Sequence, residues 1–121
     1  MEGREIPYQR ELNRALDVLR RRWTVAVLAA LAGHKRQYTD LLTAINEIER
    51  RASANGKSAR LSDRMLTDTL RQALDDGLIE REAEHRNFGA VWYRLTPAGR
   101  ALLRALRPLL EWSREHLLRD L

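Results

Sequence analysis

Residues 61–96 constrain the fold most, because a capped amphipathic helix is followed there directly by two short strands. Ser62 can cap the helix with its hydroxyl, and Leu61 and Leu66 stand at the positions of a hydrophobic staple. Gly77 offers a left-handed stop at the end of the helix. Apolar residues recur at helical spacing along one face, namely Leu66, Leu70, Ala73 and Leu74.

A hairpin is predicted after this helix, with strands over residues 79–84 and 91–95 and a polar turn over residues 85–89. We expect Tyr93 and Leu95 to face the core, and the glutamates at positions 80, 82 and 84 to face solvent. Mainly helical chains with such a small β-hairpin are typical of the winged helix-turn-helix. That fold buries one side of the helix and presents the other to duplex DNA.

Two more helices are predicted in the first third of the chain. Residues 8–20 have apolar positions at Leu12, Leu16 and Leu19 and a charged opposite face, which indicates an amphipathic helix. Residues 23–31 are apolar or small on nearly every side, so we expect this helix to be the hub of the core and to end at Gly33.

A third apolar stripe at helical spacing begins near Tyr38 and predicts a helix, with Thr39 placed to cap it. This helix would be the first of the two helices in the helix-turn-helix. The apolar period then disappears between Arg50 and Arg60, which predicts a flexible cationic loop. Such a loop is longer than the tight turn that usually joins the two helices of this motif.

Thr96 and Pro97 mark the start of a last helix that should run towards Leu118, with a kink or a break at Pro108. The leucines of this helix cover a wider arc than packing on a small domain requires. We therefore expect the last helix to meet a second copy of the chain.

Composition narrows the class of protein. The 121 residues fit a single domain, and the net charge of +5 favours polyanionic partners. The chain has no cysteine, which excludes disulfides and thiolate metal sites. The longest apolar run, residues 25–32, is too short to span a bilayer, and the charged start lacks a signal-peptide core. We expect a cytoplasmic protein at the nucleoid, with no membrane partner.

Motifs for catalysis are missing from the sequence. The three histidines are scattered without a ligand partner at helical spacing, so no metal site is expected. There is no Gly-rich phosphate loop and no nucleophile elbow. We therefore expect neither enzymatic activity nor a cofactor.

Candidate DNA contacts come from three regions. Arg64, Thr67 and Arg71 lie in the first two turns of the helix after Ser62, the part that approaches base edges in the major groove. Arg86 and Asn87 at the hairpin tip suit a minor groove, and basic residues around the long loop suit phosphates. The full set is Arg36, Lys57, Arg60, Ser62, Arg64, Thr67, Asp68, Arg71, Arg86 and Asn87.

A plainer interpretation stays open for several of these residues. Arg64 with Asp68, and Arg71 with Asp75, are spaced to form exposed pairs on the helix, each contributing only a few tenths of a kcal/mol. The loop cations, including Lys57, are equally well explained as solvated charge.

Several landmarks occur in the order found in the HxlR-type family of bacterial winged-helix regulators, which the chain resembles over most of its length. The matching stretches are Ala15-Leu16-Asp17-Val18-Leu19 with Trp23, Arg36-Gln37-Tyr38 with Leu41, Leu66-Thr67 with Leu70-Arg71 and Leu74, Asp76-Gly77-Leu78-Ile79, Tyr93-Arg94-Leu95-Thr96 with Gly99, and Trp112 with His116.

The resemblance implies a dimeric transcription factor whose first and last helices form the dimer. On this basis the expected interface comprises Leu12, Leu16, Leu102, Leu106, Leu109, Leu110, Trp112 and Leu117. Thiol-sensing members carry a cysteine near the start of the first helix, whereas the region around Arg10 has none. The family's short glycine-containing turn before the Trp is replaced by three arginines at positions 20–22, and the loop after the third helix is longer than the family pattern.

The sequence predicts a sequence-specific regulator that binds a pseudo-palindromic operator as a homodimer, with repression as the default and activation equally compatible. One alternative is a winged helix used for protein association. Another is a regulator that binds an apolar small molecule between the dimer helices. Trp23, Trp92 and Trp112 are expected to be core or dimer aromatics, or in the last case to line that cavity.

Overall fold

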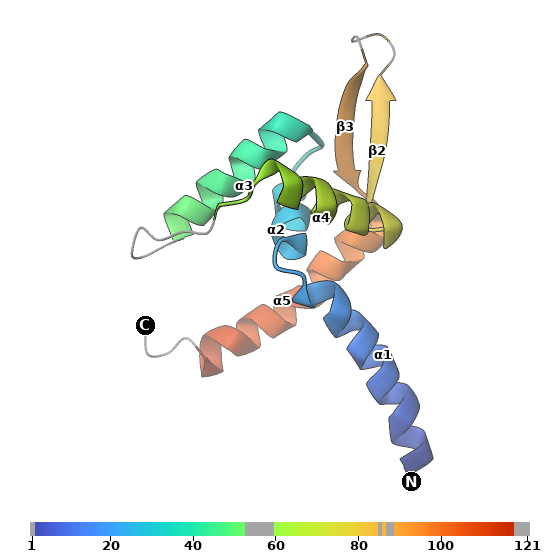
Figure 1. Cartoon of the computed structure of the whole chain (residues 1–121). Helices are drawn as coiled ribbons and strands as arrows, with labels where there is room; N and C mark the ends of the chain where they lie inside the picture. The colour runs from blue at the N-terminus through green and yellow to red at the C-terminus, as the bar shows by residue number, and fades with distance from the viewer. Residues whose placement is uncertain (1, 53–59, 85, 87–88, 118–121) are drawn as a thin grey trace.

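The computed structural model describes residues 2–52, 60–84, 86 and 89–117, with side chains from Tyr8 onward. In this part of the chain, there are five helices and a small three-stranded antiparallel sheet, most of which projects from the helical body (Figure 1). The elements are α1 (Glu2–Arg20), α2 (Thr24–Ala30), β1 (Arg36–Gln37), α3 (Tyr38–Ala52), α4 (Asp63–Asp75), β2 (Ile79–Glu84), β3 (Ala90–Leu95) and α5 (Pro97–His116).

The short helix α2 is the hub of the core, as the sequence predicts. It contacts α1, α3, α4 and α5, and Val27 and Leu28 are completely buried. Buried residues of α3 and α4 close around it, including Leu41 and Ile45 of α3 and Leu66 of α4, and Val18 of α1 packs against them half-buried. Burial of this apolar surface is the main stabilising contribution to the fold.

The hairpin of β2 and β3 projects from the body as a wing (Figure 1). Its strands are those expected, except that β3 begins one residue earlier, at Ala90. The sequence did not predict β1, which pairs with β3 through Arg36 opposite Tyr93 and Gln37 opposite Trp92. Two residues are too few to give a period-2 pattern, so only the tertiary fold identifies this strand.

The start of α5 lies close to the backbone that enters the wing. The hydroxyl of Thr96 accepts a hydrogen bond from the Gly99 amide at 3.1 Å, which confirms the predicted cap. A Cβ on Gly99 would collide with the carbonyl oxygen of Leu78. Glycine therefore allows α5 to approach the wing at this point.

Four predictions about helix bounds need correction. Helix α2 ends at Ala30, with Leu31 as its C-cap, and not at Gly33. Helix α3 begins at Tyr38, so Thr39 is its second residue and does not cap it. The same helix continues to Ala52, so Arg50 and Arg51 are helical, and only residues 53–59 of the expected loop lie outside the described part. Helix α5 is a single helix with Pro108 inside it, so the proline does not divide it. The sequence of residues 50–52 has no apolar periodicity, but arginine and alanine favour helix.

Candidate nucleic-acid interface

The N-terminus of α4 is fixed by two sets of hydrogen bonds. The hydroxyl of Ser62 accepts from the amide of Met65 at 3.2 Å, as the sequence predicts. Just before it, the Asn46 side chain of α3 binds both backbone groups of Leu61, accepting from its amide at 2.8 Å and donating to its carbonyl at 3.1 Å. Asn46 therefore holds the residue that precedes the N-cap of α4 against α3, whatever the length of the loop between the two helices.

Tyr38 makes a second link between α3 and α4. Its hydroxyl lies 2.9 Å from the carboxylate of Asp63 and 3.5 Å from the hydroxyl of Thr67. Because the single phenol proton points to Asp63, Thr67 is the donor in the longer contact. Burial is the largest effect on the pKa of Tyr38 and raises it. The hydrogen bond with Thr67 lowers this pKa, and Asp63 raises it. The phenol is therefore neutral and acts as a donor at physiological pH.

The outward face of α4 carries four of the ten predicted DNA contacts. Arg64, Thr67, Asp68 and Arg71 are all exposed, at positions that share one helix face. The predicted pairs are not the ones observed: Arg71 lies 3.8 Å from Asp68 rather than near Asp75. Both partners in this pair are largely exposed, so the contact is weak and leaves Arg71 free to exchange partners.

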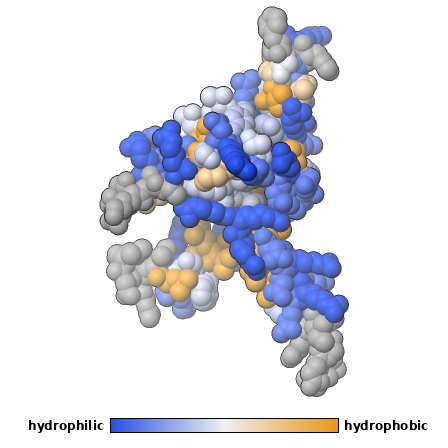
Figure 2. All heavy atoms as spheres, in the orientation of Figure 1, coloured by the Kyte–Doolittle hydropathy of each residue, from blue (hydrophilic) through white to orange (hydrophobic). Residues whose placement is uncertain are grey.

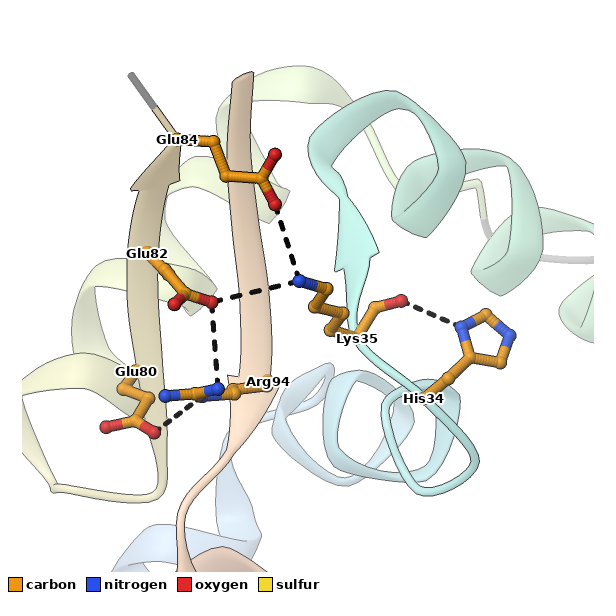
Figure 3. Close-up of polar contacts among 6 residues, drawn as sticks. All are labelled: His34, Lys35, Glu80, Glu82, Glu84 and Arg94. Carbon is orange, nitrogen blue, oxygen red and sulfur yellow. Dashed lines mark hydrogen bonds and ion pairs between the residues drawn. The ribbon is translucent and has the colours of Figure 1, made fainter. Parts of the chain in front are cut away.

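One face of the wing is occupied by an ion-pair network (Figure 3). Arg94 of β3 lies 2.7 Å from Glu80 and 3.6 Å from Glu82 of β2, so both pairs cross between the strands. Lys35, which the sequence analysis did not single out, lies 3.5 Å from Glu84 and 4.8 Å from the centre of the Trp92 ring. Three carboxylates on this face would repel phosphate, which argues against contact between this side of the wing and DNA.

The remaining predicted contacts occupy different environments. Arg36 donates to the carbonyl of Ala30 at 2.7 Å and pairs with Asp40 at 3.1 Å, so its guanidinium joins the end of α2 to the start of α3. Arg60, before α4, and Arg86, in the wing turn, are exposed. Lys57 and Asn87 lie outside the described residues.

Apolar side chains are exposed where α1 and α5 diverge from the body (Figure 2). A groove of about 460 Å³ between these helices and α2 is lined mainly by leucines and Val25. Of the expected interface residues, Leu102 and Leu106 are half-buried. The others are between 43% and 63% exposed, namely Leu12, Leu16, Leu109, Leu110, Trp112 and Leu117.

The three tryptophans have separate roles. Trp23 is a core residue, as one of the interpretations predicts, and Trp92 lies under Lys35 on the wing. Trp112 is half exposed on α5 and stacks on His116 with ring centres 5.3 Å apart. None of the three lines the apolar groove.

No described helix combines the length and hydropathy needed to cross a bilayer. Within the same residues, no cluster of His, Asp and Glu side chains has the arrangement of a metal site.

The family profile of the HxlR-like helix-turn-helix matches residues 18–120. The chain belongs to this family. An uncharacterized HTH-type transcriptional regulator from Methanothermobacter thermautotrophicus is 28% identical over 100 residues, which cover 83% of the chain and 66% of that protein. The HxlR-like chain is therefore a helix-turn-helix transcriptional regulator that binds DNA, and its family is one of regulators rather than enzymes.

Solved structures agree with this assignment. A protein from Enterococcus faecalis V583, described as a MarR-family transcriptional regulator, is 28% identical with a TM-score of 0.72, over 93% of this chain and 90% of its own. The reduced form of the regulator YodB from B. subtilis has the same TM-score at 19% identity, over 88% of this chain and 92% of its own, and shows the fold alone.

Proposed function

We propose that the chain is a homodimeric repressor that inserts α4 of each protomer into successive major grooves of a pseudo-palindromic operator. The observation that carries the proposal is the free outward face of α4. Its first three turns expose Arg64, Thr67 and Arg71, and the wing projects beside α4. Arg64 in two-pronged contact with guanine would discriminate against other bases by about 1 to 3 kcal/mol.

Apolar exposure on α1 and α5 supports the dimer. The groove between these helices is continuous with exposed Leu109 and Leu110, an arrangement that a second copy would bury. A dimer would set the two recognition helices about 34 Å apart, one turn of the duplex. Occlusion of a promoter by such a dimer is the simplest route to repression.

The dimer can be tested independently of DNA. Leu110→Glu places a charge in the apolar groove and should convert the dimer to monomers in sedimentation experiments. Glu111→Gln, on the same turn but outside the groove, is the matched control and should remain dimeric. A wild-type chain that sediments as a monomer over the concentrations used would contradict the dimer.

DNA binding is tested by selecting bound fragments from genomic DNA and measuring their affinity by fluorescence anisotropy over a salt series. We expect protection of two half-sites one helical turn apart and a log–log salt slope of about 0.9 for each phosphate contact. Transcription from the selected promoter should fall when the protein is added. Binding that is indifferent to salt would contradict the proposal.

The apolar groove favours a second function, the sensing of an apolar small molecule. Its volume of about 460 Å³ lies within the range of ligand pockets, and its walls are almost entirely aliphatic. Release of operator DNA by one member of a panel of apolar compounds, together with a change in the emission of Trp112, would support this function. The absence of any response across the panel would contradict it.

A further inference from the structure

A second pocket lies between α4 and the base of the wing. Its volume is about 270 Å³, and its polar lining comes from α3, α4, β2 and β3 together. The polar residues are Tyr38, Thr67, Arg71, Arg81 and Tyr93. None of Tyr38, Arg81 and Tyr93 was predicted to contact DNA, although the alternation that puts the glutamates of β2 on one face puts Arg81 on the other.

The two faces of the wing differ in charge. Glu80, Glu82 and Glu84 occupy the face that carries Lys35 and Arg94 (Figure 3). Arg81 is directly opposite Tyr93 in the β2–β3 register, and both residues line the pocket beside α4. The positive face of the wing is thus turned towards the recognition helix, and the acidic face is turned away from it.

The cations of this pocket are available to an external anion. Arg81 is exposed and forms no ion pair with any residue in the described part of the chain. Arg71 has only the exposed 3.8 Å contact with Asp68. By contrast, Arg94 on the other face is tied to Glu80 at 2.7 Å.

The surroundings strengthen an interaction with an anion. Leu70 and Leu74 line the same pocket and add apolar surface beside the two arginines. Tyr93 also lines the pocket, and its hydroxyl adds a donor. The planar guanidinium fork matches the oxygens of a phosphate and can bind two of them at once.

We propose that this pocket seats one backbone phosphate of duplex DNA in each half-site, between Arg71 of α4 and Arg81 of β2. The inference rests on the proposed function, because the phosphate is one beside the groove that α4 enters. A phosphate held from both the helix and the wing fixes the register of α4 on the duplex without reading sequence.

The test compares two charge-equivalent variants of the wing. Arg81→Gln and Arg94→Gln remove the same charge from opposite faces of one hairpin. We expect Arg81→Gln to weaken binding to operator and to unrelated duplex by the same factor, about tenfold for a charge-assisted contact. The salt slope should fall by up to about 0.9 for each half-site, because Arg71 alone then neutralises the phosphate. Arg94→Gln should bind with nearly the wild-type salt slope.

A neutral methylphosphonate, placed at each backbone position in turn, locates the phosphate without altering the protein. Wild type should lose affinity at a set of positions. Arg81→Gln should be less sensitive than wild type at one of them in each half-site, where Arg71 alone remains, and equally sensitive at the others. Equal sensitivity of the two proteins at every position would overturn the phosphate seat.

The outcomes separate this proposal from the proposed function. Wild-type protein that binds no duplex would contradict both. Wild-type protein that binds duplex, with Arg81→Gln indistinguishable from Arg94→Gln, would overturn the phosphate seat and leave the regulator intact. Binding of inorganic phosphate that Arg81→Gln abolishes, with DNA affinity unchanged, would assign the pocket to a free anion and also overturn the proposal.

Discussion

The hydroxyl of Tyr38 donates a hydrogen bond to the carboxylate of Asp63 over 2.9 Å, and this contact joins the first residue of α3 to the first residue of α4. An exposed carboxylate at position 63 would repel DNA phosphate. In the structure its charge has a partner and also lies at a helix N-terminus, where a carboxylate is favourable.

Tyr38→Phe should lower the free energy of unfolding by about 1 kcal/mol, the usual contribution of one such hydrogen bond. It should also weaken duplex binding, because Asp63 would then be free to face the phosphates. Urea unfolding and anisotropy measure the two effects. Tyr93→Phe is the control for stability, since its hydroxyl has no hydrogen bond to a described residue, and a Tyr38→Phe variant as stable as this control would contradict the role of the contact.

Alkaline pH should act through the same phenol. The folded state raises the pKa of Tyr38 above its ordinary value of 10.0, so the folded chain holds this proton more tightly than the unfolded chain does. The resulting stabilisation is present below pH 10.0 and is lost as the pH rises through the folded pKa. Above pH 10.0, the free energy of unfolding should therefore fall more steeply with pH in wild type than in Tyr38→Phe. Parallel plots of this free energy against pH for the two proteins would contradict the role of the Tyr38 phenol.

Asn46→Ala should destabilise the chain by about 2 kcal/mol, because both backbone groups of buried Leu61 lose their partner. The cap at Ser62 follows directly, so hydrogen exchange at the Met65 amide should accelerate along with the loss of stability. Asn13→Ala, on the exposed side of α1, is the matched control. Unchanged exchange at Met65 would mean that the cap does not depend on Asn46.

Local signals in the sequence predicted much of the fold. Ser62, Gly77 and Thr96 each act over a few residues. Ser62 and Thr96 cap the starts of α4 and α5 as expected, and Gly77 follows the end of α4 with a backbone φ of 74°. The alternation of glutamates along β2 also predicted which face of the wing is acidic.

Long-range contacts could not be predicted in the same way. Asn46 bonds to a residue 15 positions away, and Lys35 reaches Glu84 across 49. Neither residue carries a periodic or capping signal. The place of Arg36 just before a helix favours a phosphate contact, but its guanidinium is bound to Ala30 and Asp40. Only the folded chain brings these groups together.

Gly99→Ala should cost about 1 to 3 kcal/mol, because the new methyl group would overlap the backbone carbonyl of Leu78, which cannot rotate away. The displaced end of α5 should also disturb the base of the wing. Gly33→Ala is the matched control, since a Cβ there meets no atom within 4 Å. Thermal unfolding measures the stability of both variants. Equal melting temperatures would show that the close contact between Gly99 of α5 and the Leu78 carbonyl does not contribute to stability.

The central claim is that the outward face of α4 binds duplex DNA, and anisotropy with a double variant tests it most directly. Arg64→Ala/Arg71→Ala should lose most of its affinity for the selected operator while its dimer and its melting temperature stay as in wild type. Arg14→Ala/Arg104→Ala removes the same charge from exposed positions on α1 and α5 and should bind normally. Equal operator affinity of the two double variants would contradict the account.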